Sequence, residues 1–147
     1  MQNKPSLIQQ ILRFGVVGGL SFLIDFAIYT SIYLIFGKDK LTVMVGGFLG
    51  FTISLIFNYI SSMKFVFVHD ESMDRKKEFS IFAILSLIGL VLNEALIFLV
   101  LFVFDQLPFL QNSFLWNLKE TVGKVFATGV VMVYNFVTRK IFIEKKS

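Results

Sequence analysis

Three ionisable side chains stand inside long apolar segments of this 147-residue chain. Asp25 is near the middle of the first segment, Glu94 lies within the third, and Lys124 lies within the fourth. A charge at the centre of a membrane-spanning helix costs at least about 2.5–3.5 kcal/mol on insertion scales. Such groups usually face protein or water, and they mark a path, a binding site or a paired charge. They are therefore the first candidate site residues.

The segments that must position these residues are each long enough to cross a bilayer, which takes about 20 mainly apolar residues. The hydrophobic fraction is 56% and the mean hydropathy is +0.77. We predict an all-α, polytopic membrane protein with a single domain over residues 1–147. The first segment has no Ala-x-Ala cleavage pattern, so we expect a retained helix and not a signal peptide. The predicted spans are Phe14–Phe36, Leu41–Met63, Phe79–Phe104 and Leu118–Thr138.

The basic residues predict the orientation of these spans. Ten of them fall on one side: Lys4, Arg13, Lys64, Arg75, Lys76, Lys77, Arg139, Lys140, Lys145 and Lys146. The opposite loops carry only Lys38, Lys40 and Lys119. By the positive-inside rule, both termini and the middle loop are cytoplasmic. The net charge of +4 then reflects orientation and contact with anionic lipid headgroups, and no nucleic-acid partner is expected.

The two halves of the sequence resemble each other. Each begins with basic and then aromatic residues, and each ends with an Asn-aromatic pair followed by basic and aromatic residues. These endings are Asn58-Tyr59 before Lys64-Phe65-Val66-Phe67, and Asn135-Phe136 before Arg139-Lys140-Ile141-Phe142. Both halves would start on the cytoplasmic side, so we predict two helical hairpins that form a parallel repeat about an axis along the membrane normal.

Polar residues share helical faces in three of the spans. At about 100° per residue, the fourth span carries a stripe of Thr121, Lys124, Thr128, Asn135 and Arg139. Small and polar residues also align in the first span (Gly18, Ser21, Asp25, Tyr29) and in the second (Gly47, Gly50, Ser54, Asn58, Ser61). Such faces serve either for close helix packing or for a polar groove. Glu94 and Lys124 lie at similar depths, so either they form a structural ion pair or Lys124 meets an anionic substrate group.

The segments outside the four spans allow further predictions. Ser6 and Gln9 have capping-box spacing, which starts either an interfacial helix or the first span itself. Residues 105–117 form an aromatic loop suited to the membrane interface, and His69 is expected in a solvated loop. The chain has no cysteine, no cluster with metal-ligand spacing and no nucleophile–base set. We therefore expect no catalytic residue, no metal, no cofactor and no enzymatic activity.

These motifs resemble the GtrA-like family of small four-span membrane proteins. The resemblance rests on Arg13-Phe14, Gly18-Gly19, Asp25 and the two Asn-to-basic motifs, and it runs from Arg13 to Phe142. It implies a role in glycosylation of cell-surface polysaccharide or wall teichoic acid at the bacterial plasma membrane. Members are thought to move undecaprenyl-phosphate sugars from the inner to the outer leaflet, beside membrane glycosyltransferases. One departure is Ser62, which stands where the second repeat has Arg139.

A lipid-phosphate sugar requires a polar, partly cationic groove that opens sideways to the membrane. We expect basic residues to bind its phosphate and polar residues to line the groove for its sugar. A homodimer or larger assembly is expected, because four short helices enclose little space. Alternatives are a non-transporting scaffold for a glycosyltransferase and a small proton-coupled multidrug exporter that uses Asp25. The phosphate candidates are Arg13, Lys64, Lys124, Arg139 and Lys140, and the groove candidates are Asp25, Asn58, Asn93, Glu94, Thr128 and Asn135.

Overall fold

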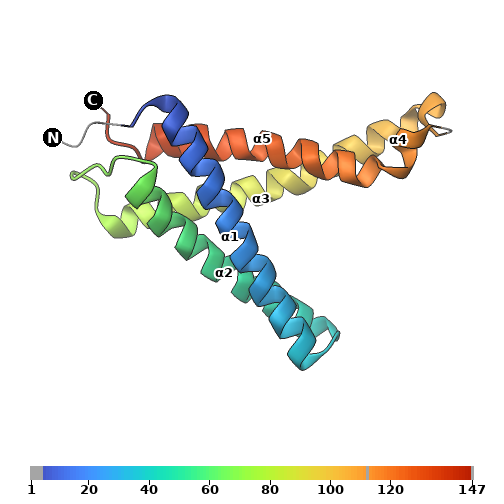
Figure 1. The fold of residues 1–147 in the computed structure, drawn as a ribbon, viewed down its shortest axis with the longest axis horizontal. Coiled ribbons are helices and arrows are strands. Elements are labelled where there is room, and N and C mark those ends of the chain that lie inside the picture. The colour runs from blue at the N-terminus through green and yellow to red at the C-terminus, as the bar shows by residue number, and fades with distance from the viewer. Residues whose placement is uncertain (1–4, 112, 147) are drawn as a thin grey trace. The chain divides into compact units, whose positions relative to one another are not determined.

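The computed structural model describes residues 5–111 and 113–146, and these are helical with no β-strand (Figure 1). Four of the helices are long and apolar enough to span a membrane, which confirms the predicted all-α, four-span fold. Lys4 lies outside the described residues. The elements are α1 (Leu7–Phe36), α2 (Lys40–Phe65), α3 (Arg75–Gln106), η1 (Pro108–Leu110), α4 (Phe114–Asn117) and α5 (Lys119–Phe142).

The helix ends follow local sequence signals. Ser6 caps α1: its side chain accepts from the Gln9 backbone N–H at 3.3 Å, and the Gln9 side chain accepts from the Ser6 N–H at 3.1 Å. This confirms the capping box and makes the segment from Leu7 to Arg13 the first turns of α1 itself and not a separate interfacial helix. The span helices also run beyond their predicted limits, since α3 begins at Arg75 and α5 continues to Phe142.

A tight turn joins α1 to α2. Gly37 has a φ of 100°, which favours glycine because it has no Cβ. Asp39 then caps α2 by accepting from the Thr42 backbone N–H at 3.0 Å and from the Thr42 hydroxyl at 2.6 Å. These hydrogen bonds stabilise the carboxylate and hold the pKa of Asp39 below its ordinary value.

The chain packs as two compact units. Unit 1 comprises the chain up to Phe79 together with Ile143 onward, and unit 2 comprises Ser80–Phe142. Unit 1 contains the hairpin of α1 and α2, and unit 2 contains most of α3 packed with α5. Each predicted repeat therefore corresponds to one hairpin. Asn58 and Asn135 lie about two turns before the ends of α2 and α5, as the repeat predicts.

One end of unit 1 joins segments that are far apart in sequence. Gln10 of α1 is 1% exposed, and its Nε2 donates to the Val66 carbonyl at 3.2 Å and to Glu144 Oε1 at 2.5 Å. The Lys145 N–H donates to the Val68 carbonyl at 2.9 Å, next to a β-bridge between His69 and Glu144. We call this region the tied end. It holds the start of α1, the segment after α2 and the C-terminal segment together.

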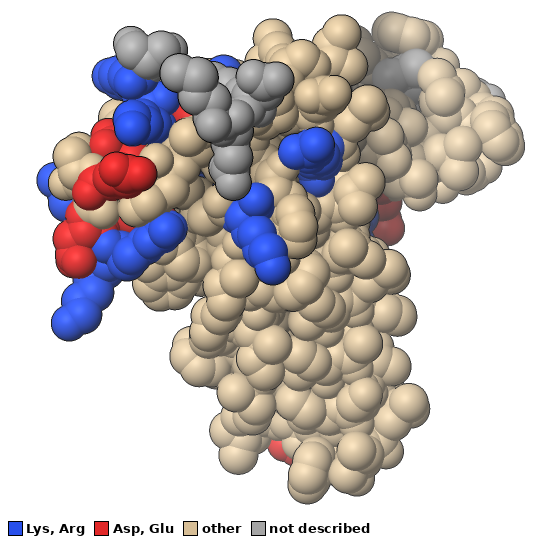
Figure 2. Space-filling model, turned by 60° about the vertical axis from the view of Figure 1, so that its left-hand side comes forward, with Lys and Arg blue, Asp and Glu red and all other residues tan. Residues whose placement is uncertain are grey.

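Charged side chains in unit 1 are concentrated at the tied end. In Figure 2, Lys and Arg gather there with acidic residues, while the visible surface of the α1–α2 hairpin beyond it is almost free of charge. Many large apolar side chains on the helices are exposed, among them Val16, Phe22, Phe48 and Ile60. An exposed apolar surface of this extent is expected for helices that face lipid tails.

The connection between α3 and α5 contains η1 and α4. Phe109 and Phe114 are exposed there, in keeping with an aromatic interface loop, although membrane contact of the loop stays a prediction. At the end of this connection, Lys119 Nζ forms an ion pair with Asp105 Oδ1 at 3.0 Å. The same Nζ lies 4.0 Å from the Trp116 ring centroid. These contacts fix the start of α5 near the end of α3 within unit 2.

Candidate functional site

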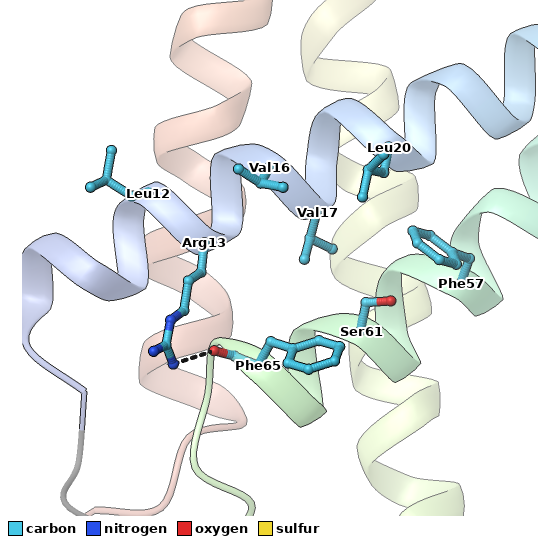
Figure 3. A pocket seen from close by; sticks show the side chains of 8 residues that line it. All are labelled: Leu12, Arg13, Val16, Val17, Leu20, Phe57, Ser61 and Phe65. Carbon is cyan, nitrogen blue, oxygen red and sulfur yellow. Dashed lines mark hydrogen bonds between the residues drawn. The ribbon is translucent and has the colours of Figure 1, made fainter.

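An apolar groove of about 640 Å³ lies between α1 and α2 in unit 1 (Figure 3). Arg13 and Ser61 are its two polar lining residues. Leu12, Val16 and Phe65 are exposed, so the groove opens at the surface of the hairpin. Its α1 side is formed by Leu12, Arg13, Val16, Val17 and Leu20, and its α2 side by Phe57, Ser61 and Phe65.

Arg13 reaches from α1 to the end of α2, where its Nη1 donates to the Phe65 carbonyl at 3.1 Å (Figure 3). Helix ends leave carbonyl groups without intrahelical partners, which explains why a guanidinium binds there. The side chain is exposed, and a guanidinium carries five N–H donors. Arg13 can therefore bridge the hairpin and still bind an anion at the mouth of the groove.

A second cavity of about 550 Å³ shares Arg13 and Phe65 with the groove. We call it the polar cavity, because Lys64, His69 and Glu71 line it together with Arg13. Lys64 is exposed, with its Nζ 5.3 Å from the Phe65 ring centroid. The other lining residues are Pro5, Met63 and Val66–Val68. The groove and the polar cavity thus form one amphipathic site, and the guanidinium of Arg13 lies where they meet.

A buried carboxylate, that of Glu78, contacts His69 of the polar cavity. Glu78 is 0% exposed, and it accepts hydrogen bonds from the Tyr59 hydroxyl at 2.6 Å and from Arg75 Nη1 at 3.1 Å. Its other oxygen contacts His69 Nδ1. Burying a carboxylate is costly unless partners surround it, so these three groups are what make the position tolerable.

The expectation of a solvated His69 is wrong. Its side chain is only 22% exposed, and Glu78 binds it. The ring is therefore held in one orientation beside the polar cavity. Across residues 5–111 and 113–146, no group of three His, Cys, Asp or Glu side chains is placed to hold a metal ion.

Two predicted groove residues of unit 1 lie away from this site. Asp25 is half-buried in α1, and its carboxylate lies over Gly50 of α2: a Cβ added there would overlap Asp25 Oδ1. Asn58 is half-buried in α2, and its Oδ1 accepts from the Ser62 hydroxyl at 3.1 Å. Of the unit 1 candidates, Arg13 and Lys64 come together at the amphipathic site, whereas Asp25 and Asn58 lie elsewhere on the hairpin.

Unit 2 corrects the expected position of Arg139. This residue is 3% exposed, with Nη2 donating to the Ser86 hydroxyl at 2.8 Å and the guanidinium 3.8 Å from the Phe82 ring centroid. A planar guanidinium can stack on an aromatic ring while donating at its edge, so α3 accommodates it. Arg139 is therefore buried, and it does not reach lipid phosphates at a membrane surface as expected. Lys140 is half-buried, 5.9 Å from the Phe136 ring centroid.

The other polar residues of unit 2 do not form one continuous stripe. Asn135 packs against Gly89, and its Oδ1 is buried without a hydrogen bond within the described chain. Thr128 is exposed nearer the start of α5. The stripe is thus divided between an exposed part toward the start of α5 and a more buried part toward its end.

Of the two alternatives for Glu94 and Lys124, the structural ion pair does not form among the described residues. Both side chains are exposed, and the described residues include no ion pair between them. The polar neighbour of Glu94 is Asn93, whose Nδ2 lies 3.5 Å from Oε1. Similar positions along two helices therefore do not bring these two side chains into an ion pair.

A family model described as "GtrA/DPMS, transmembrane domain" matches residues 13–144. The chain belongs to this family. The match confirms the resemblance read from the sequence motifs and identifies a multi-pass membrane protein of polyprenyl-phosphate sugar handling. It begins at Arg13 and ends at Glu144, so it includes most of the amphipathic site, whereas Gln10 and Lys145 of the tied end lie just outside it. Neither the curated proteins nor the solved structures contain a significant match.

For this GtrA/DPMS protein, sequence reasoning missed three buried polar residues, Gln10, Glu78 and Glu144, and the hydrogen bond from the half-buried Tyr59 to Glu78. Glu78 gave one usable signal, since it is an acidic residue that directly follows three basic residues at the start of a predicted span. Gln10 and Glu144 gave none, because their contact joins the two ends of the chain. Their burial depends on tertiary contacts that neither local spacing nor hydropathy encodes.

Proposed function

We propose that this GtrA/DPMS protein is a non-enzymatic flippase in the bacterial plasma membrane. It moves a polyprenyl-phosphate-linked monosaccharide from the inner to the outer leaflet, for glycosylation of cell-wall polysaccharide or teichoic acid. The observation that supports this most is the sharing of Arg13 by an apolar groove and a polar cavity. A lipid-phosphate sugar has the same order of parts: an apolar tail, an anionic phosphodiester and a polar sugar.

Each part of the lipid has a counterpart in the amphipathic site. The first prenyl units of the tail lie along Val16, Val17 and Leu20 in the groove, where burial from water is favourable. The phosphodiester binds the guanidinium of Arg13 and the ammonium of Lys64, because charge-assisted hydrogen bonds to phosphate are among the stronger ones. The rest of the long tail stays in the bilayer, since the groove opens at the hairpin surface.

Passage of the headgroup requires polar contacts within the spans, because sugar hydroxyls are costly to transfer into hydrocarbon unpaired. Asp25, Asn58, Asn93, Glu94, Thr128 and Asn135 remain our candidates for these contacts. Asn135 has the clearest support, because its Oδ1 has no hydrogen-bond partner within the described chain. Lys124 and Lys140 remain candidate phosphate contacts, while Arg139 is better described as a packing residue of unit 2.

The test is flipping in proteoliposomes that contain only the purified protein and a polyprenyl-phosphate glucose. Outer-leaflet sugar is measured with a membrane-impermeant lectin. Wild-type protein should flip the lipid, and Arg13→Gln should lose most of this activity while inserting normally. Lys77→Gln is the matched control, since Lys77 is exposed and lines neither hollow. Equal flipping by wild type and Arg13→Gln would refute the phosphate site.

A second candidate function is a scaffold that binds a membrane glycosyltransferase without transport. The exposed Glu94 and Lys124 favour it, because charges within a span need a protein or water partner. The same proteoliposomes separate the two functions. A scaffold flips nothing alone yet raises the activity of an added transferase, and Lys124→Ala should abolish that rise. A flippase works without the transferase.

A further inference from the structure

We infer that the polar cavity is a sugar subsite that selects an uncharged monosaccharide over an anionic one, with Glu71 as the discriminating residue. This inference rests on the proposed function, because it takes the lipid phosphate to sit at Arg13. The cavity volume of about 550 Å³ lies within the usual range for small-molecule sites, roughly 300–1,000 Å³. One sugar ring attached to the phosphate can therefore enter it.

The charges that line the cavity balance one phosphodiester. Arg13 and Lys64 carry two positive charges, and Glu71 carries one negative charge. A phosphodiester adds one negative charge, so an uncharged sugar leaves the occupied cavity neutral. A carboxylated sugar would bring a second negative charge close to Glu71, and like charges at short range disfavour binding. The selection thus follows from the number of charged groups in the lining.

His69 supplies a directed acceptor in the same cavity. Glu78 is a buried carboxylate with Arg75 and Tyr59 also bound to it, so the His69 Nδ1 that contacts it is the donor. In the neutral ring, Nε2 is then the acceptor. Glu71 adds carboxylate acceptors, while Lys64 and Arg13 add donors. Sugar hydroxyls both donate and accept, so this mixture suits a polyol headgroup.

The binding test uses three short-chain probes that differ only in the headgroup: farnesyl phosphate, farnesyl phosphoglucose and farnesyl phosphoglucuronate. Affinities are measured on the purified full-length protein in nanodiscs. Wild type should bind the glucose probe about five-fold or more tightly than the glucuronate probe, because the second carboxylate is repelled by Glu71. Glu71→Gln should bring this ratio close to one. Asp74→Asn is the matched control, since Asp74 is exposed nearby but does not line the cavity.

A second variant tests the hydroxyl contacts. His69→Ala should weaken the glucose probe several-fold while leaving sugar-free farnesyl phosphate unchanged, because only the sugar reaches His69. The inference is overturned if wild type does not discriminate between the two sugars, or if Glu71→Gln keeps the wild-type ratio. Failure of the proposed phosphate site is a different result: Arg13→Gln would then bind farnesyl phosphate as tightly as wild type does.

Discussion

The carboxylate of Asp25 on α1 lies over the Cα of Gly50 on α2. A Cβ added at Gly50 would overlap Asp25 Oδ1 and lie 2.9 Å from the Asp25 carbonyl oxygen, closer than real Cβ contacts come. Gly50 therefore provides the space that allows an acidic side chain within the span to pack between two helices. Small residues commonly permit such close approach in membranes. Here the glycine also determines where the carboxylate lies.

The first prediction follows from this contact. Gly50→Ala should force α1 and α2 apart or displace Asp25, and we expect a loss of about 1–3 kcal/mol of stability, as for overpacked cores. The measurement is thermal unfolding of the purified protein in detergent. Gly47→Ala on the same helix is the control, since a Cβ there meets nothing within 4 Å.

A double variant shows whether the overlap is the cause. Asp25→Ala removes the side-chain oxygen that the new methyl group meets, so it should recover part of the stability lost in Gly50→Ala. Coupling of this kind is expected only for residues in contact. Additive losses in the double variant would mean that Gly50 acts through something other than Asp25.

The sequence predicts the helices of this fold well, and its buried polar contacts poorly. Long apolar runs, the Ser6 cap and the Gly37 turn are local features, and all three are found in the structure. The contact between Gln10 and Glu144 joins residues 134 positions apart, and local patterns cannot foresee it. The Arg13–Phe65 contact also escaped prediction, although both residues lay in recognised motifs.

The Glu94–Lys124 pair, one of two alternatives that the sequence left open, shows a second limit of sequence reasoning. Residue counting gives depth in the membrane, but it does not give the direction in which a side chain points around a packed helix. In α5, Gly123 and Ala127 are buried toward the start of the helix, whereas Arg139 is buried near its end. The buried face of this helix thus turns along its length. A stripe drawn on an ideal helix combined residues that the structure separates.

The second prediction concerns Arg139. Because its guanidinium lies on Phe82 and binds Ser86, Arg139→Lys should lower stability by about 1–2 kcal/mol, as a lysine cannot reproduce the planar stack with the edge-on hydrogen bond. Thermal unfolding measures the loss, and Lys140→Arg is the matched control at the adjacent half-buried position. Binding of farnesyl phosphate should not change. If Arg139→Lys unfolds at the wild-type temperature but no longer binds farnesyl phosphate, Arg139 is a phosphate-binding residue.

The third prediction is the orientation of the chain. Single cysteines at Ser72 and Lys38 lie in opposite turns of the predicted topology, and the protein has no native cysteine. In whole cells, a membrane-impermeant thiol reagent should label the Lys38→Cys protein and leave the Ser72→Cys protein unlabelled until the cells are opened. Labelling of Ser72→Cys in intact cells would reverse the expected orientation, and it would move the amphipathic site to the outer leaflet.

The fourth prediction separates the role of Glu78 from that of the residues that touch ligand. Glu78→Gln keeps the shape of the side chain but removes the charge that holds Arg75 and His69. We expect a stability loss of about 1–3 kcal/mol, the usual cost of leaving buried polar groups poorly satisfied. Tyr59→Phe removes only one of the three contacts and should cost less. Glu120→Gln, at an exposed acidic residue of α5, should change neither stability nor binding.

Ligand binding then tests whether Glu78 acts through His69. If Glu78 orients the ring, Glu78→Gln should weaken farnesyl phosphoglucose about as much as His69→Ala does, and it should leave sugar-free farnesyl phosphate unaffected. The effects of the two substitutions should also not add, since both act on the same His69 acceptor. A purely structural role would weaken both probes together, because the phosphate site at Arg13 depends on the same tied end. Unequal weakening of the two probes is therefore the result that identifies Glu78 as a positioning residue for the sugar.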